Sequence, residues 1–478
     1  MKIFIKTGFA FLYYLTICPF TMAQTTPDFT NIPLNDLSAF NEPGKNWVIS
    51  SDVAVDYTLQ GDMTPINGNG IIVNDMSEKN KTHLFTKELF GDLELQLDFM
   101  MANSSNSGVY LQGRYEIQLF DSWRKQPVTS SDCGGIYQRW KPERGRFEGT
   151  TPFMNVCRAP GLWQHLVIKF RAPKFNAKGE KIANAVFEQV YLNGVLVQEQ
   201  AQVTGPTNSA MFPNEKNEQS LGPLVLQGDH GKVAFKNIRY RKLPTSDSIK
   251  NSEIDYWQTR NSIFVTPGIK PVFIKTFLNY GDKKLTHVLS VGNGNQVNYS
   301  YDVKTGAIFQ IWRGNFMDLT KSWEDRGGEQ LGTPLGSVIE LSNSPVVATL
   351  SDSEEAWPDS MSFEDLDNKG YILNKVRSPV FDYSIKGIEV KDSIVTRLDG
   401  KGINRTIDVL NPSHNVYCLI AEGNGIMRIN SDTYSINDKS YYIKINKKYN
   451  PIVRRSQKGQ ELIVKYDAAG SINYSLIW

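Results

Sequence analysis

The stretch GRYEIQLFDSW, residues 113–123, places two polar side chains, Glu116 and Gln118, at alternate positions and Asp121 three residues further on. In an extended strand alternate side chains point to opposite faces, so Glu116 and Gln118 share a face and the intervening apolar residues share the other. A bulge between Gln118 and Asp121 would bring all three polar residues to one side. Two acids on one face are what cleavage of a glycosidic bond needs, because one donates a proton and the other acts as base or nucleophile. The alternative is a solvent-facing strand.

The elements that must position these residues are predicted to be short strands. Alternating apolar residues recur along the chain, whereas helical periodicity is scarce. Residues 186–197 contain two β-rich runs joined by Asn193-Gly194, a pair that tolerates the positive φ angles of a tight hairpin turn. Residues 298–312 have a second hairpin pattern. Many short strands between turn residues indicate a β-sandwich.

The length of 478 residues suits two domains. Composition shifts to a polar stretch near Pro244, and β patterning resumes near Ser262. We therefore predict four segments, which are a signal peptide (1–23), a first domain (27–243), a linker (244–261) and a second β-rich domain (262–478). Lys plus Arg number 52 and Asp plus Glu number 50, and this balance favours neither nucleic acid nor an anionic membrane as a partner.

The first residues have the pattern of an export signal. Lys2 and Lys6 form a basic start, an apolar run follows from Phe9 to Phe20, and small residues precede a cleavage site near Gln24. We expect an exported protein of the periplasm or cell surface, with no transmembrane segment after cleavage. Cys18 suggests a lipoprotein signal, but Ile17 stands where that signal has a small residue, so lipidation ranks second.

Three cysteines remain after removal of the signal. Cys133 and Cys157 are a candidate disulfide for an oxidising compartment, and the alternative is that all three are buried free thiols. The five histidines are scattered, and no HExxH or CxxC motif occurs. We therefore expect no cofactor and no metal site, although loop carbonyls in this type of sandwich can hold a structural Ca²⁺.

Two resemblances carry the functional prediction. Residues 116–121 are similar to the E-x-D-x-x-E strand of laminarinase-type glycosidases, with Gln118 and Asp121 in place of the last two acids. Residues 27–243 also resemble the 3-keto-disaccharide hydrolase domain family, which implies a concanavalin/laminarinase-like jelly-roll β-sandwich in an all-β protein. The motifs that carry this resemblance are NSGVYLQGRYEIQ (106–118), CGGIY (133–137), PGLWQ (160–164), GPT (205–207), GPLVLQGDHG (222–231) and FKNIR (235–239).

The family resemblance implies proton abstraction, elimination and hydration on a 3-keto-glycoside, working beside a separate sugar 3-oxidoreductase that makes the ketone. Such a site needs a base near C2, an acid near the glycosidic oxygen and donors for the enolate oxygen. The candidate catalytic residues are Glu116, Asp121, His230 and Arg114, with acid and base not separated. The candidate substrate-binding residues are Gln118, Tyr137, Trp140 and Gln227.

The second domain resembles, over residues 286–320, an uncharacterised β domain found beside sugar dehydrogenase and cytochrome modules. No catalytic residues follow from this, and we expect an accessory domain that binds carbohydrate or packs on the first. Two other functions stay open, a non-catalytic carbohydrate-binding jelly roll and a conventional glycosidase acting on unoxidised glycans. Convergence of Glu116 and Asp121 in a groove would favour an enzyme.

Overall fold

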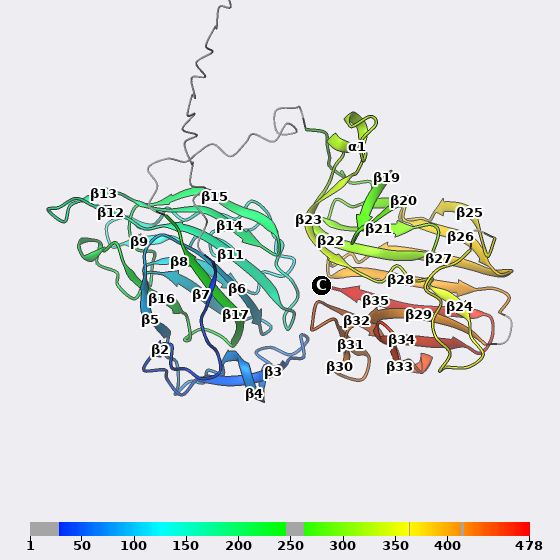
Figure 1. Cartoon of the computed structure of the whole chain (residues 1–478), viewed down its shortest axis with the longest axis horizontal. Helices are drawn as coiled ribbons and strands as arrows, with labels where there is room; N and C mark the ends of the chain where they lie inside the picture. The colour runs from blue at the N-terminus through cyan, green and yellow to red at the C-terminus, as the bar shows by residue number, and fades with distance from the viewer. Residues whose placement is uncertain (1–27, 245–261, 363, 413–414) are drawn as a thin grey trace, which may run out of the picture.

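The computed structural model describes residues 28–244, 262–362, 364–412 and 415–478. The predicted signal peptide and, apart from Pro244, the predicted linker lie outside the described residues. We refer below to the N-terminal half (28–244) and the C-terminal half (262–478), which lie side by side in Figure 1. Within the described residues, strands of one half pair only with strands of the same half.

The N-terminal half is built on two antiparallel sheets. The larger one, with eight strands among the described residues, runs in the order β15 (Val195–Val203), β14 (Ala185–Leu192), β11 (Gln164–Arg171), β6 (Leu93–Met101), β17 (Val233–Lys242), β4 (Thr64–Asn74) and β3 (Trp47–Ala54), with β1 (Thr30–Asn31) also on β17. The smaller one runs in the order β2 (Phe40–Asn41), β5 (Leu84–Phe90), β16 (Gly222–Leu226), β7 (Asn106–Leu111) and β8 (Tyr115–Phe120). Short excursions are β9 (Arg139–Lys141) with β10 (Gly145–Phe147), β12 (Lys174–Phe175) with β13 (Lys181–Ala183), and the 3₁₀ turn η1 (Glu215–Asn217).

The chain passes between these two sheets repeatedly, from β4 to β5, from β6 to β7, and from β15 through β16 to β17. One apolar cluster lies between the sheets, and it takes Leu97 and Phe99 from β6 and Ile117 and Leu119 from β8, all with no exposed surface. These residues alternate along their strands, so each strand contributes one apolar face to the shared core. The predicted jelly-roll β-sandwich is confirmed.

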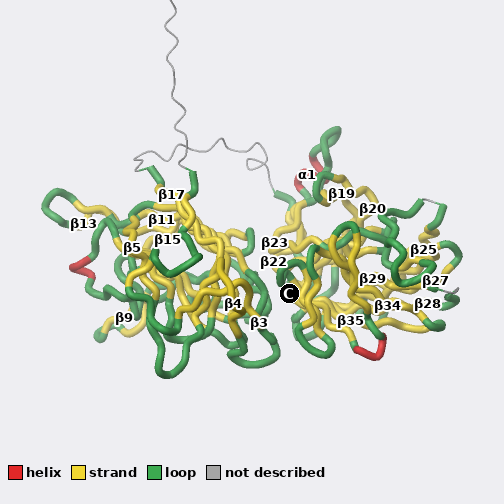
Figure 2. The backbone as a smooth tube through the Cα atoms, turned by 60° about the horizontal axis from the view of Figure 1, so that its bottom comes forward, coloured by secondary structure: helices red, strands yellow, loops and turns green. Residues whose placement is uncertain are grey.

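The C-terminal half is also almost entirely β, and Figure 2 shows only short helical segments in it. A six-stranded sheet contains β18 (Phe264–Val265), β22 (Ala307–Asp318), β21 (Val297–Asp302), β20 (Lys283–Gly292) and β19 (Val272–Tyr280), with β23 (Thr333–Glu340) on β22. A four-stranded sheet contains β24 (Val347–Thr349), β29 (Val416–Gly423), β34 (Gly459–Tyr466) and β33 (Ile452–Ser456). An eight-stranded sheet contains β25 (Leu366–Leu373), β26 (Pro379–Ile385), β27 (Ile388–Thr396), β28 (Gly402–Val409), β35 (Gly470–Ile477), β32 (Tyr441–Ile445), β31 (Thr433–Ile436) and β30 (Ile426–Arg428). The helical segments are α1 (Thr320–Glu324) and η3 (Lys447–Tyr449).

Both predicted hairpins form. Asn193 and Gly194 join β14 to β15 with φ angles of 52° and 81°, which are the positive values that Asn and Gly adopt at low cost. The second hairpin is β21 with β22. Among the described residues, no helix has the length and apolar character needed to cross a membrane.

The two halves share an apolar contact. The main core cluster of the C-terminal half includes Tyr57, Ala159 and Leu162 from the N-terminal half. The Tyr57 ring stacks on Tyr442 with 4.8 Å between centroids, and the Tyr442 hydroxyl donates to the Pro160 carbonyl over 3.0 Å. This contact fixes one half against the other through side chains from both.

Candidate functional site

The polar face of β8 is buried. Glu116 is 2% exposed and Gln118 is 4% exposed, although both lie on the face away from the sandwich core. Residues 134–137 lie along the free edge of β8, where Gln118 N–H donates to Gly135 O over 2.8 Å and Tyr137 N–H donates to Glu116 O over 3.1 Å. This burial contradicts the solvent-facing alternative for this strand. Carboxyl groups are rarely buried in folded proteins, so the burial of Glu116 calls for an explanation.

Gly108 on β7 makes room for the Glu116 carboxyl group. Gly108 pairs with Gln118 across the ladder, and the Glu116 side chain leans over it. A Cβ atom at position 108 would lie 2.3 Å from Glu116 Oε1, which is closer than any real contact. The sequence therefore keeps a glycine here because the carboxyl group occupies the space of a side chain.

Burial raises the pKa of Glu116 to about 8. The neighbouring Tyr110 side chain lowers this pKa, and the negative charge of Asp229 raises it further. Loss of hydration penalises the charged form of a carboxyl group, so Glu116 is mostly protonated at neutral pH. A protonated carboxyl group can donate a proton to a leaving oxygen.

The loop between β16 and β17 brings an imidazole and a second carboxylate to this face. His230 Nδ1 lies 2.6 Å from Asp229 Oδ1, and the His230 side chain is half exposed. Gln227 Nε2 lies 3.4 Å from the same nitrogen. When Nδ1 carries the proton and donates to Asp229, the other ring nitrogen is free to accept one.

Residues of the preceding strands hold this loop in place. Gly228 N–H donates to His83 Nδ1 over 3.2 Å, and the Asn74 side chain donates to Gly231 O over 2.8 Å. Burial lowers the pKa of His83, which suits a neutral ring that accepts from a backbone N–H. The position of Asp229 and His230 is therefore set by contacts on both sides of them.

The Tyr110 hydroxyl lies beside the Glu116 carboxyl group and interacts with it, and Gln227 Oε1 is a buried acceptor without a hydrogen-bond partner among the described residues. Burial, followed by the charge of Glu116, raises the pKa of Tyr110 far above its ordinary value, so its hydroxyl stays protonated. Unpartnered buried polar atoms are rare in folded proteins. The unpartnered Gln227 oxygen suits a site where a ligand completes the hydrogen bonding.

Two predicted substrate-binding residues lie beside this group. Gln118 Nε2 donates to Asn106 Oδ1 over 2.5 Å, which leaves its own carbonyl oxygen as an acceptor. Tyr137 is half-buried, and its side chain helps to raise the pKa of Tyr110. The structure therefore gathers Glu116, Gln118, Tyr137, Gln227 and His230 from the predicted set on one face of the smaller sheet.

Asp121 does not join this group. The register between β7 and β8 is unbroken from Leu111↔Tyr115 to Asn106↔Phe120, so the bulge needed to turn Asp121 towards Glu116 is absent. The Asp121 carboxylate instead accepts from Ser104 N–H over 2.8 Å at the end of the strand. Burial raises the pKa of Asp121, and the carboxylate braces a turn.

Arg114 and Trp140 occupy other surroundings. The Arg114 guanidinium donates to the Gln112 and Asn217 carbonyls over 3.0 and 2.9 Å and lies over the Phe212 ring. These contacts brace the loop that follows β15. Trp140 is 52% exposed on β9, where a sugar ring has access to it.

Cys133 and Cys157 are buried free thiols in the structure, so the predicted disulfide is not formed in it. The two side chains are nevertheless neighbours. A hydrogen bond with Cys133 is the largest cause that raises the pKa of Cys157 well above its ordinary value, and burial is the second cause. Disulfide formation between them stays a prediction. Among the described residues, no group of three or more His, Cys, Asp or Glu side chains is arranged to hold a metal ion.

The sequence prediction missed Tyr110, His83 and Asp229. Tyr110 and Asp229 stand within the motifs 106–118 and 222–231, next to residues that were selected. Strand pairing is the signal that identifies Tyr110 as a site residue, since Tyr110 lies opposite Glu116 on the neighbouring strand. Such a pairing becomes visible only when the register is known.

This face combines a buried carboxyl group with a raised pKa, an imidazole on a carboxylate and an unpartnered amide oxygen on a jelly-roll sheet. Residues 35–241 match the model of the 3-keto-alpha-glucoside-1,2-lyase-like domain. This match supports a function on glycosides.

Solved structures with likeness to the chain include two proteins of Parabacteroides distasonis, each named a "putative glycosyl hydrolase". They are 22% and 21% identical, cover 50% and 45% of this chain and all of their own, and have TM-scores of 0.31 and 0.32. LamAcat from Zobellia galactanivorans is 10% identical, covers 45% of this chain and 98% of its own, and has a TM-score of 0.19. No curated protein matches the chain.

Proposed function

We propose that the protein cleaves 3-keto-glycosides by proton abstraction, elimination and hydration, with net hydrolysis of the glycosidic bond. The observation that supports this most is the buried Glu116 carboxyl group. Burial keeps this group protonated at neutral pH, and the negative charge of Asp229 raises its pKa further. Asp229 in turn contacts His230. One proton donor and one proton acceptor are the two groups that the reaction needs.

The chemistry balances without an oxidant. A ketone at C3 acidifies the C2 hydrogen, and a base removes it to form an enolate. The enolate expels the glycosidic oxygen from C1, and an acid protonates that oxygen as it leaves. Water then adds across the C1–C2 double bond, placing hydroxyl on C1 and hydrogen on C2. The oxidation that makes the ketone belongs to the separate sugar 3-oxidoreductase.

The residues divide between these steps according to their contacts. His230, oriented by Asp229, accepts the C2 proton at its free ring nitrogen, and Glu116 protonates the leaving oxygen. The Tyr110 hydroxyl is buried beside Glu116 and stays protonated, so it suits the enolate oxygen. Gln118, Tyr137 and Gln227 bind sugar hydroxyls. The contacts of Arg114 with backbone carbonyls do not support a catalytic role for it.

A conventional glycosidase acting on unoxidised glycans is the second candidate. The interaction between Glu116 and Asp229 favours it, because two carboxyl groups at one site are the requirement for that reaction. Asp121 does not supply the second carboxylate, since it accepts from the backbone of a turn. A purely carbohydrate-binding jelly roll is the third candidate. The separation of Asp121 from Glu116 favours it, whereas the raised pKa of Glu116 is not required by it.

The test uses the purified mature chain with a 3-keto-glucoside and with its unoxidised parent, and product is followed by chromatography. We expect cleavage of the keto-sugar alone, and a loss of about 10²-fold or more in Glu116→Gln and His230→Asn. Asp121→Asn is the matched control, with less than about a tenfold loss expected for a turn-bracing carboxylate. Cleavage of the parent glycoside alone would replace the proposal with the conventional glycosidase. Binding without cleavage of either sugar would favour the carbohydrate-binding protein.

A further inference from the structure

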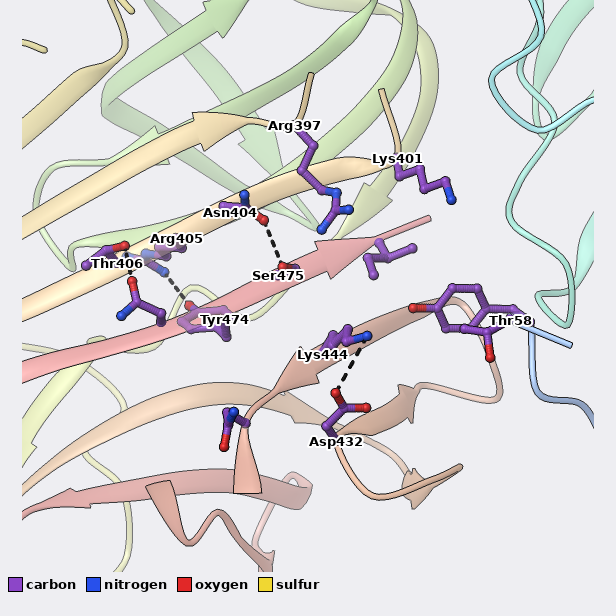
Figure 3. A pocket seen from close by; sticks show the side chains of 14 residues that line it. Thr58, Arg397, Lys401, Asn404, Arg405, Thr406, Asp432, Lys444, Tyr474 and Ser475 are labelled. Atoms are coloured by element: carbon purple, nitrogen blue, oxygen red, sulfur yellow. Dashed lines mark hydrogen bonds and ion pairs between the residues drawn. The ribbon is translucent and has the colours of Figure 1, made fainter. Parts of the chain in front are cut away.

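A cavity of about 560 Å³ lies where the two halves meet. Its floor belongs to the adjacent strands β28, β35 and β32 of the C-terminal half, and Tyr57 and Thr58 of the N-terminal half line its other side (Figure 3). The volume suits a small ligand such as a disaccharide. This cavity is separate from the site around Glu116.

The floor carries rows of amide and hydroxyl side chains across neighbouring strands. Asn404 pairs with Ser475, which in turn pairs with Lys444, so the three form one row over three strands. Ser475 Oγ donates to Asn404 Oδ1 over 2.8 Å. Thr406 and Asn473 form a second row in the same way. Strands lie about 4.8 Å apart, so these rows present hydrogen-bonding groups at that spacing across the floor.

Four cationic side chains and one carboxylate, that of Asp432, line this cavity. Among the described residues, no carboxylate oxygen lies within ion-pair distance of Lys401 Nζ, which instead faces the Trp123 ring at 5.3 Å. Lys444 has only a loose ion pair with Asp432 at 3.6 Å. Figure 3 shows Lys401 and Lys444 around the cavity. A ligand with a carboxylate would complete the pairing of these cations.

The cavity is formed before any ligand arrives, because contacts between the two halves hold the overhanging loop. The Asn430 side chain donates to Asp56 Oδ2 over 2.9 Å, next to Tyr57 in the sequence. An ion pair joins Lys439 to Asp52 on the preceding strand. A sheet face that was merely solvated would need no such cover. A preformed site loses less entropy on binding.

We propose that this cavity binds an acidic saccharide, with sugar hydroxyls on the rows of Asn404 and Thr406 and the sugar carboxylate on Lys401. The proposal is independent of the catalytic proposal above. It assigns the C-terminal half a recognition role to which the N-terminal half contributes directly.

The test measures binding to the full mature chain by calorimetry at low salt with three probes. These are a glucuronic-acid-containing disaccharide, a neutral disaccharide of the same size and sodium sulfate. We expect the acidic disaccharide to bind about tenfold more tightly than the neutral one. Lys401→Met should abolish that ratio, and Asn404→Ala should weaken both saccharides equally. The control Lys458→Met, in a different part of the C-terminal half, should change neither affinity.

Each other result overturns the proposal. Equal affinity for both disaccharides would contradict recognition of the carboxylate. Binding of neither disaccharide would show that the cavity is not a saccharide site. Sulfate binding as tightly as the acidic disaccharide would show that only a charge is bound. An unchanged ratio in Lys401→Met, in a variant with the melting temperature of the wild type, would place binding elsewhere. The variant Glu116→Gln, which should lose catalytic activity, should keep all these affinities unchanged.

Discussion

Replacing Glu116 by glutamine removes a carboxyl group whose protonated form the fold prefers. The pKa of this group rises from 4.5 to about 8 on folding, chiefly because of burial. The folded protein therefore binds this proton more tightly than the unfolded chain does. The associated stability is complete below pH 4.5 and is lost as the pH rises through the folded pKa near 8.

The size of this effect follows from the pKa difference. A shift of one pKa unit corresponds to about 1.4 kcal/mol, so the cost of burying Glu116 is roughly 3 kcal/mol at pH 7 and under about 1 kcal/mol at pH 5. Glutamine cannot ionise and avoids this cost at either pH. For a domain of this size, about 2 kcal/mol corresponds to roughly 4–8 °C in melting temperature.

The assay is scanning calorimetry of the wild type and Glu116→Gln at pH 5 and pH 7. We expect the melting temperature of the variant relative to the wild type to rise by about 4–8 °C between the two pH values. The control is Glu94→Gln, which removes a buried carboxylate paired with Arg241 and should lower the melting temperature at both. An equal difference between Glu116→Gln and the wild type at pH 5 and pH 7 would refute the reasoning.

Three further predictions concern the same half. Gly108→Ala should lower kcat by about tenfold or more with the fold retained, because the new methyl group displaces Glu116, and near-normal kcat would contradict this. Asp229→Asn should lower kcat and move the alkaline limb of the pH–rate profile to lower pH, since it removes a charge that raises the pKa of Glu116; a shift to higher pH would contradict the assignment. Mild oxidation should join Cys133 to Cys157, so that thiol titration of the denatured mature chain falls from three groups to one; an unchanged count would show that the pair does not form.

The strands and the apolar core followed from local patterns. Alternation in β6 and β8 predicted which residues face inward, and Asn193-Gly194 predicted its hairpin, because side-chain period and turn chemistry are properties of adjacent residues. Which strands pair was not accessible in this way. That information places Tyr110 opposite Glu116, and it arises from contacts between distant parts of the chain.

The candidate site was predicted in part for the same reason. Glu116 and Gln118 stood out by their spacing, and His230 by its motif. Asp121 was chosen for its charge, but the regular register of β8 turns it away and a turn binds it. Asp229 was overlooked because its influence on Glu116 exists only after β16 lies beside β7. Residues 134–137, which pair with the edge of β8, were not predicted by any strand pattern.

The measurement that tests the central claim most directly follows the hydrogen at C2. A 3-keto-glucoside labelled with deuterium at C2 is cleaved by the wild type in ordinary water, and the first-formed 3-keto-glucose is examined by mass spectrometry. Labelled 3-keto-glucose incubated alone corrects for spontaneous exchange. Elimination and hydration predict that cleavage removes the label in every turnover. Retention of deuterium in the product would show that the glycosidic bond is cleaved without C2 proton abstraction, and would contradict the account.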